Sequence, residues 1–333
     1  MERVCLCDTI ATSRLKEVTK IFAYFAAVVV LGALLAPPLY WSLHAIEPWA
    51  LANDLLRWSP DESGEIHIHG VLGAVMEADF QKIFHRAIMV SALVLLWPAW
   101  RLMGGRSLKR LGLTPDPRAT AHLIRGFLIG GGLVALMAAA YVGLKFYHFK
   151  TPLPWGSLLQ VALSAAVVAC LEEWIFRGAI MGLFLRALKP IPALAWTSAI
   201  FAILHFLRSG EDTPSGPVTW SSAFQLLPHM FQGFSDPVML LSGFATLFAL
   251  AWLLGYARLR TGALWMSIGI HAGVVFVKMG FAKFTKRDEL HLPWVGPELQ
   301  IGVVPVVLLL IGVFLVWRRM EYEELLPNPK RSA

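Results

Sequence analysis

Two carboxylates and a guanidinium lie close together in one strongly apolar segment of the chain. Residues 169–178 read ACLEEWIFRG, which places Glu172, Glu173 and Arg177 among apolar neighbours. An ionisable side chain in such a segment is costly and is therefore a candidate for function. Glu173 and Arg177 are four residues apart on one helical face, so they can form an ion pair. Glu172 points about 100° away around a helix and lacks that partner.

The lone carboxylate of Glu172 suits general-base chemistry, because it can take a proton from a reacting group. The alternative is a purely structural role, in which the three charged residues form an ion-pair cluster that locks helix packing. The composition of this segment alone does not decide between the two.

Two histidines stand alone in later apolar segments. His205 ends the run FAILH at residues 201–205, and His271 is the centre of GIHAG at residues 269–273. Each alone reads as a histidine packed in a core. At about 1.5 Å per residue, Glu172, His205 and His271 lie roughly 24, 21 and 14 Å from the predicted inner ends of their helices. These depths permit one shared pocket, and we expect the three side chains to meet.

The elements that must position these residues are membrane-spanning helices. Hydrophobic residues make up 57% of the 333 positions and charged residues only 15%, whereas a soluble domain carries about 25% charged residues. A crossing needs roughly 20 apolar residues. We therefore predict an all-α fold, a polytopic bundle of about eight transmembrane helices. The predicted spans are residues 20–43, 86–104, 121–147, 156–188, 191–208, 237–257, 262–282 and 299–318.

The fourth predicted span is too long for a single untilted crossing. Pro190 and Pro192 must end it before the fifth span begins, because proline disfavours helix at its own position and at the preceding residue.

Lysine and arginine predict the orientation of the bundle. With the N-terminus in the cytoplasm, the cytoplasmic segments hold 17 of these residues and the outer segments hold 10. Both termini are therefore predicted to be cytoplasmic, in a multi-pass protein of the cell inner membrane. The net charge of +7 does not predict nucleic-acid binding, because the main basic stretch, residues 101–118, lies between two spans.

The polar residues of the fourth and fifth spans resemble two motifs of the CPBP family of intramembrane proteases. This family includes the type II CAAX prenyl endopeptidases and bacteriocin-processing enzymes. The motif E-E-x-x-x-R matches Glu172, Glu173 and Arg177, and the motif F-x-x-x-H matches Phe201 and His205.

A third family motif, H-x-x-x-N, matches only at His271, because Val275 stands where the family has asparagine. The resemblance covers about residues 156–282. In the family this asparagine works with the histidine to steady an oxyanion, and losing one such donor costs about 10²–10³ in rate. Another donor, a different subfamily mechanism or loss of activity could each explain the change. Ser267, one turn before His271, is one candidate donor.

The resemblance implies glutamate-dependent peptide hydrolysis. Glu172 with His205 would activate a water, His271 would stabilise the oxyanion, and Glu173 and Arg177, with Phe201, would support the site. No cofactor is expected. A zinc site built from Glu172, His205 and His271 is the alternative, although no H-E-x-x-H motif is present.

These predictions describe three regions and one main function. Residues 1–150 would form an N-terminal membrane region with three spans and an outer loop at 44–84. Residues 151–285 would form the CPBP-like catalytic core, and residues 286–333 would form a final span and a cytoplasmic tail. The function would be cleavage of a membrane-anchored peptide or protein in the lipid bilayer, with no nucleic-acid partner. The alternative is a non-catalytic protein on the same scaffold, acting as an immunity or assembly factor. A small-solute transporter is disfavoured because the polar residues cluster at one site.

Overall fold

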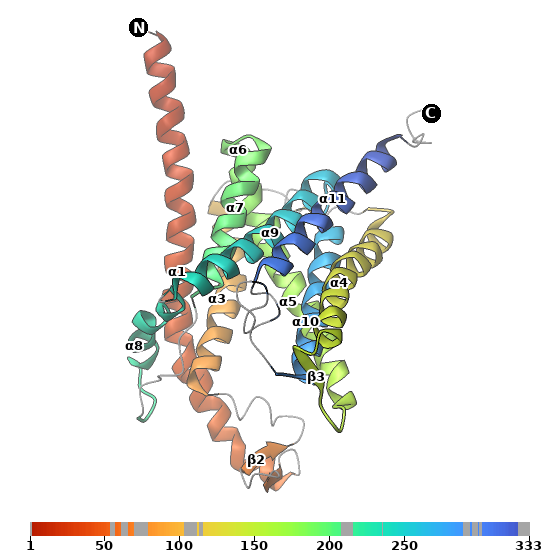
Figure 1. Cartoon of the computed structure of the whole chain (residues 1–333). Helices are drawn as coiled ribbons and strands as arrows, with labels where there is room; N and C mark the ends of the chain where they lie inside the picture. The colour runs from red at the N-terminus through yellow and green to blue at the C-terminus, as the bar shows by residue number, and fades with distance from the viewer. Residues whose placement is uncertain are drawn as a thin grey trace. The chain divides into compact units, whose positions relative to one another are not determined.

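The computed structural model of the chain is mainly helical (Figure 1). It describes residues 2–53, 57–60, 66–69, 79–102, 112, 116–207, 216–234, 236–288, 294, 299 and 302–325. The chain divides into two compact units. The first comprises residues 1–103 and 207–233, and the second comprises residues 104–206 and 234–333.

The first unit is built on a long N-terminal helix. Its elements are α1 (Glu2–Ala52), β1 (Arg57–Pro60), β2 (Ile66–His69), α3 (Phe80–Leu102), α8 (Ser222–His229) and most of the short η4 (Gln232–Phe234). The helices α1, α3 and α8 pack together, and β1 pairs antiparallel with β2. Their shared core comprises Ala33, Ala36, Phe84, Ala87, Ala223, Leu226 and Met230.

The first predicted span was wrong at its end. Helix α1 continues past residue 43 to Ala52, although Pro37, Pro38 and Pro48 lie inside it. Transmembrane helices tolerate proline where neighbouring groups satisfy the freed backbone. Of the predicted outer loop at 44–84, the end of α1, the two strands and the start of α3 are described. The rest lies outside the described residues.

The second unit contains every predicted site residue. Its elements are α4 (Ala119–Gly143), β3 (Tyr147–Phe149), η2 (Trp155–Ser157), α5 (Leu158–Glu173), the π-helical η3 (Trp174–Ile180), α6 (Met181–Ala187), α7 (Pro190–Leu204), α9 (Pro237–Thr261), α10 (Trp265–Phe284), β4 (Thr285–Arg287) and α11 (Val303–Leu325). The break before α7 is confirmed, since Leu188 and Lys189 are extended and Pro190 is the first helical residue. The predicted three-region division stays a prediction.

Six helical segments among the described residues are long and apolar enough to cross a membrane. They are Thr19–Ala52, Phe80–Leu102, Ala119–Gly143, Trp155–Arg186, Leu240–Thr261 and Trp265–Phe284. The remaining two predicted spans correspond to shorter apolar helices, Pro190–Leu204 and Val303–Arg318. The chain is thus a multi-pass helical membrane protein, whereas the count of eight and the cytoplasmic termini stay predictions.

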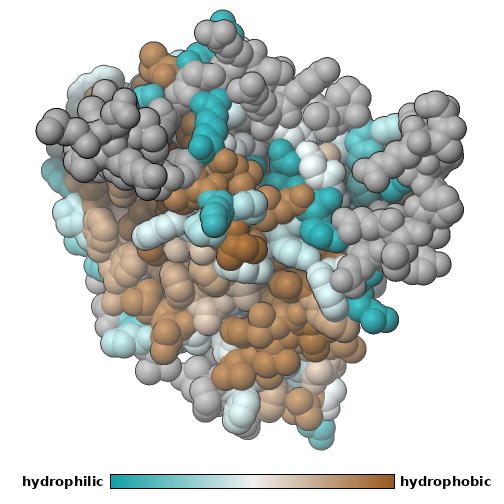
Figure 2. Space-filling view, turned by 90° about the horizontal axis from the view of Figure 1, so that it is seen from above, coloured by the Kyte–Doolittle hydropathy of each residue, from teal (hydrophilic) through white to brown (hydrophobic). Residues whose placement is uncertain are grey.

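The surface of the molecule carries broad areas of hydrophobic residues (Figure 2). Several large apolar side chains on the second unit are more than half exposed, among them Leu128, Leu136, Leu159 and Leu163. A soluble protein rarely exposes large contiguous apolar patches. Such a surface suits contact with lipid.

A seam of glycines joins α4 to α10, which run side by side (Figure 1). A Cβ atom at Gly130 would collide with the carbonyl oxygen of Ile270, and one at Gly273 would collide with that of Phe127. Small residues at such contacts let two helix backbones approach closely. Because Gly269 and Gly273 flank His271 in sequence, this seam fixes the helix that carries the histidine.

The two ends of the second unit are each tied by backbone contacts. At one end, β3 pairs antiparallel with β4, which joins the chain just after α4 to the end of α10. At the other end, the amide of Leu264 donates to the carbonyl of Gly112. Gly112 therefore lies beside the turn between α9 and α10.

Candidate active site

The first polar group of the site is the ion pair between Glu173 and Arg177. Arg177 Nη1 donates to Glu173 Oε1 at 2.8 Å, and both side chains are completely buried. The pair lies where α5 passes into the π-helical segment that begins at Trp174. Short π-helical segments often occur at functional sites. The pairing predicted from the four-residue spacing is confirmed.

Arg177 makes two further contacts that hold it in place. Its Nη2 donates to the carbonyl of Ala251 on α9 at 3.3 Å. Its guanidinium carbon lies 4.4 Å from the centre of the Phe201 ring on α7, a cation–π contact that is stronger when water is excluded. Arg177 therefore links the helices α5, α7 and α9 around one buried charge.

His271 on α10 is bonded to the same carboxylate oxygen. Its Nδ1 lies 2.8 Å from Glu173 Oε1, and because a carboxylate paired with arginine accepts, the ring nitrogen donates. This bond directs the other ring nitrogen, Nε2, toward Glu172. The Glu173 carboxylate therefore fixes the orientation of the imidazole ring, as in other histidine–carboxylate pairs.

His205 caps α7 and is oriented by the backbone. Its Nδ1 lies 2.8 Å from the carbonyl oxygen of Phe201, so Nδ1 carries the donated proton. In the neutral ring Nε2 is then a proton acceptor. The Phe201 ring packs against the histidine, with ring centres 4.2 Å apart.

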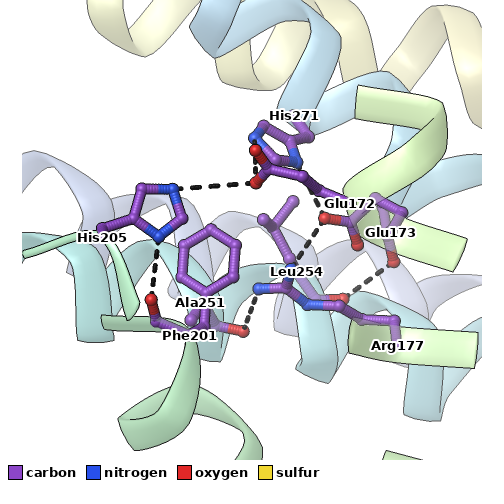
Figure 3. Close-up of polar contacts among 9 residues, drawn as sticks. Glu172, Glu173, Arg177, Phe201, His205, Ala251, Leu254 and His271 are labelled. Atoms are coloured by element: carbon purple, nitrogen blue, oxygen red, sulfur yellow. Dashed lines mark hydrogen bonds and ion pairs between the residues drawn. The ribbon is translucent and has the colours of Figure 1, made fainter. Parts of the chain in front are cut away.

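Glu172 lies between the two histidines (Figure 3). Its Oε2 is 3.7 Å from His205 Nε2 and 3.8 Å from His271 Nε2. This oxygen is buried and has no hydrogen-bond partner among the described residues. A buried carboxylate oxygen usually has a partner, which can be a water. The three residues predicted to meet do meet.

Access to this cluster differs from one side chain to the next. The Glu172 and His205 side chains are 21% and 33% exposed, whereas that of His271 is 4% exposed. A reacting group would therefore reach the cluster from the side of Glu172 and His205, with His271 behind them.

A cavity of about 110 Å³ adjoins the cluster. His205, His271 and Phe201 form one wall, and Val275 lines the same cavity on α10. The residue in the place of the family asparagine therefore faces the cavity with an apolar side chain.

Metal coordination was the alternative for these residues. Among the described residues, no group of three His, Cys, Asp or Glu side chains is arranged to hold a metal ion. The dependence of the protein on a metal stays open to experiment.

Comparison with known families identifies the segment that contains the cluster. Residues 154–277 match the family model described as type II CAAX prenyl endopeptidase Rce1-like. Residues 154–277 form an Rce1-like domain. This confirms the resemblance to the CPBP family, and because the Rce1-like family is a family of proteases, it supports a peptidase. No curated protein and no solved structure matches the chain.

The Rce1-like domain runs from just before α5 into α10, which continues past the matched residues to Phe284, and it carries the whole polar cluster. Two helices of the same compact unit, α4 and α11, lie outside the matched residues. Both contribute residues to the cavity, among them Met137 and Leu308. The cavity is therefore lined partly by the matched segment and partly by helices outside it.

The structure corrects one candidate and adds one contact. Ser267 Oγ is buried and donates to the carbonyl of Leu254 at 2.8 Å, so this hydroxyl is already engaged and is not a candidate oxyanion donor. The bond between His271 and Glu173 was missed, because the two residues are 98 positions apart. Sequence spacing signals only partners on the same helix.

Proposed function

We propose that the chain is an intramembrane endopeptidase in which Glu172 acts as the general base. The observation that supports it best is the position of Glu172 Oε2, which is buried and within 4 Å of an Nε2 atom on each histidine. A water at this point would contact a base and a second proton acceptor. The substrate is a membrane-anchored peptide or protein.

In the proposed reaction, Glu172 takes a proton from this water, and the oxygen adds to the scissile carbonyl carbon. His205 orients the water through Nε2, since its Nδ1 proton is committed to the Phe201 carbonyl. The carbonyl oxygen becomes an oxyanion. The carbon–nitrogen bond then breaks, and the proton held by Glu172 passes to the leaving amine.

His271 is the proposed oxyanion donor. Its Nδ1–H is bonded to Glu173, so a proton on Nε2 would point toward Glu172 and the cavity. Glu173 would stabilise the charge that such a protonated ring carries. This arrangement supplies an oxyanion donor without a side-chain amide at Val275.

The second candidate function is a non-catalytic membrane protein on the same scaffold. Val275 is the observation that favours it, because the family asparagine is replaced by a side chain that cannot donate a hydrogen bond. Binding of a membrane peptide without cleavage would then be the activity.

Comparing new protein termini in membranes tests the first function against the second. Cells that express the wild type are compared with cells that express Glu172→Ala, His205→Ala or His271→Ala, and new termini are mapped by mass spectrometry. We expect the wild type to produce new termini, and we expect the abundance of these termini to fall at least 100-fold in each variant. Equal termini in wild type and Glu172→Ala, with equal amounts of inserted protein, would rule out the protease.

A matched control separates chemistry from packing in this experiment. Ser267→Ala removes a buried polar group one turn from His271, but within the described part of the chain its hydroxyl bonds only the Leu254 carbonyl. We expect Ser267→Ala to keep the termini. Repeating the wild-type reaction with a chelator tests the metal alternative, since a zinc-dependent reaction would stop and recover on addition of zinc.

A further inference from the structure

A lysine inside a helix that is long and apolar enough to span the membrane lines the cavity beside the histidines. Lys278 lies on α10, well before this helix ends at Phe284, and its side chain is half-buried. An ionisable residue inside such a helix is costly and is therefore a candidate for function. A lysine near a helix end commonly extends its ammonium to the membrane surface. The structure instead places Lys278 among the residues that line the cavity.

Lys278 shares one face of α10 with His271. The residues His271, Val275 and Lys278 follow one another at intervals of four and three positions, and all three line the same cavity. Helical side chains lean toward the N-terminus of their helix, so the lysine leans back toward His271. Its charge also interacts with His205 at the end of α7. The charge of Lys278 therefore acts on the part of the cavity next to the two histidines.

Two other polar residues that line the cavity cannot compensate negative charge there. His205 donates its Nδ1 proton to a backbone carbonyl, so its Nε2 accepts a hydrogen bond and does not donate one. Thr246 on α9 is 3% exposed and donates its hydroxyl proton to the carbonyl of Ser242 at 3.1 Å. Thr246 thus offers the cavity an acceptor and no proton. Among the described lining residues, His271 and Lys278 are left to compensate an anion.

The proposed reaction moves negative charge into this cavity. The charge begins on the Glu172 carboxylate, which takes a proton from the water and becomes neutral. The oxygen of that water bonds to the scissile carbonyl carbon, and the electron pair of the carbonyl π bond moves to the carbonyl oxygen. Lys278 lines the cavity, whereas Glu172 is not among its lining residues. Charge that moves from Glu172 into the cavity therefore moves toward Lys278.

We propose that Lys278 stabilises the oxyanion by drawing this negative charge from Glu172 into the cavity. This inference rests on the proposed function. His271 donates a hydrogen bond to the oxyanion, and Lys278 compensates its charge through space. At an effective dielectric constant of about 20, a unit charge that moves from about 12 Å to about 6 Å from a cation gains about tenfold in rate. Stabilisation that arises only in the transition state raises kcat.

Kinetics of the purified protein in lipid nanodiscs test this role. A peptide that the wild type cleaves is first selected from a peptide library by mass spectrometry. Lys278→Met keeps an unbranched side chain and removes the charge. We expect it to lower kcat about tenfold and to leave KM unchanged, because the lost interaction belongs to the transition state. Lys278→Arg keeps the charge and should retain kcat within about threefold of the wild type.

The matched control is Lys283→Met on the same helix. Lys283 is exposed and is not among the residues that line the cavity. This variant removes the same charge from α10 at a distance from the reacting groups, so kcat and KM should both stay at the wild-type values. A loss of kcat equal to that of Lys278→Met would contradict a local effect of Lys278.

Chemical modification of a cysteine separates charge from packing. Lys278→Cys is made in a background with Cys5, Cys7 and Cys170 replaced by alanine, and the same background with Lys278 is the reference. The reagent 2-aminoethyl methanethiosulfonate forms a disulfide with the thiol, releases methanesulfinate and attaches a cation. Propyl methanethiosulfonate attaches a neutral chain of similar length. We expect the cation to restore kcat and the neutral chain to leave it low, even where Lys278→Met folds poorly.

Three results would overturn the role of Lys278 while leaving the protease intact. One is an unchanged kcat in Lys278→Met. The second is a raised KM with unchanged kcat, which would assign the lysine to binding a carboxylate of the substrate. The third is equal recovery with the neutral and the cationic reagent. Absence of any cleavage by the wild type would refute the proposed function instead, and the role of Lys278 with it.

Discussion

Glu173 serves two partners with one oxygen atom. Its Oε1 accepts both from Arg177 Nη1 and from His271 Nδ1, each at 2.8 Å. Because the carboxylate is buried, its charge must be compensated inside the protein. The structure of the site therefore depends on a residue that does not touch the reacting atoms in the proposed mechanism.

Replacing Arg177 by methionine should destabilise the protein strongly. Breaking a buried ion pair leaves an uncompensated charge and costs about 3–5 kcal/mol. We expect Arg177→Met to lower the free energy of unfolding by this amount, measured by denaturant titration in detergent micelles. Lys189→Met, at an exposed position, should change it by less than about 0.5 kcal/mol.

The double variant Glu173→Gln with Arg177→Met provides the counter-test. It removes both charges, so it should lose less stability than Arg177→Met alone. If the double variant loses as much stability as Arg177→Met alone, or more, then the unpaired charge of Glu173 does not cause the destabilisation in Arg177→Met.

For single residues, contacts within one helix were easier to predict from the sequence than contacts between residues far apart in the chain. The bond from Glu173 to Arg177 follows from their separation on one helix turn. The contact of Glu172 with both histidines follows from depth along three helices. The second role of Glu173, as the partner of His271, and the engagement of Ser267 depend on how helices rotate against one another, which no local pattern specifies.

At the scale of the helices, α4 and α10 approach each other closely. Glycines on both sides bring their backbones into contact, and His271 lies between two of those glycines on α10. A change on α4 should therefore reach the histidine through the packing of the two helices.

Adding one methyl group at Gly130 should impair the site. The new Cβ would collide with the carbonyl oxygen of Ile270, the residue before His271. Overpacking of this kind costs about 1–3 kcal/mol, and the displacement of α10 should lower the cleavage rate at least tenfold. The rate and the unfolding free energy of Gly130→Ala are compared with those of the wild type.

The same substitution at Gly132 is the matched control. Nothing lies within 4 Å of a Cβ at this position, although it is on the same helix. Alanine there should raise the stability by up to about 1 kcal/mol through helix propensity and leave the rate unchanged. Equal effects at Gly130 and Gly132 would contradict a role for the close helix contact.

Element boundaries were predictable where a strong local signal exists. Pro190 and Pro192 predicted the start of α7, which begins at Pro190. The end of the first span lacked such a signal, since α1 continues through Pro37, Pro38 and Pro48 to Ala52. The π-helical segment after Glu173 was not predictable, because its apolar sequence fits an ordinary α-helix equally well.

At the scale of the whole molecule, the backbone contacts at each end of the second unit bear on how its helices cross the membrane. The strands β3 and β4 bring residues 147–149 and 285–287 together, which were both predicted to be outside. Gly112 and Leu264, at the contact near the other end, belong to segments predicted to be inside or at the inner end of a span. The contacts therefore agree with helices that alternate across the membrane.

Thiol labelling tests this orientation. In a variant with Cys5, Cys7 and Cys170 replaced by alanine, single cysteines are placed at the exposed residues Lys150 and Lys189. A membrane-impermeant maleimide should label Lys150→Cys in intact cells and Lys189→Cys only after permeabilisation. The reverse pattern would invert the predicted topology, and labelling of both in intact cells would refute alternation.

The convergence of Glu172 and His205 on one water is tested most directly by a double-mutant cycle. Cleavage rates are measured for purified wild type, Glu172→Gln, His205→Ala and the double variant, in lipid nanodiscs and with one peptide that the wild type cleaves. Residues that act as a unit have strongly non-additive effects. We expect each single variant to lose at least 100-fold and the double variant to lose no more than the worse single one. Activity of Glu172→Gln within tenfold of the wild type, or fully multiplicative losses, would contradict the shared site.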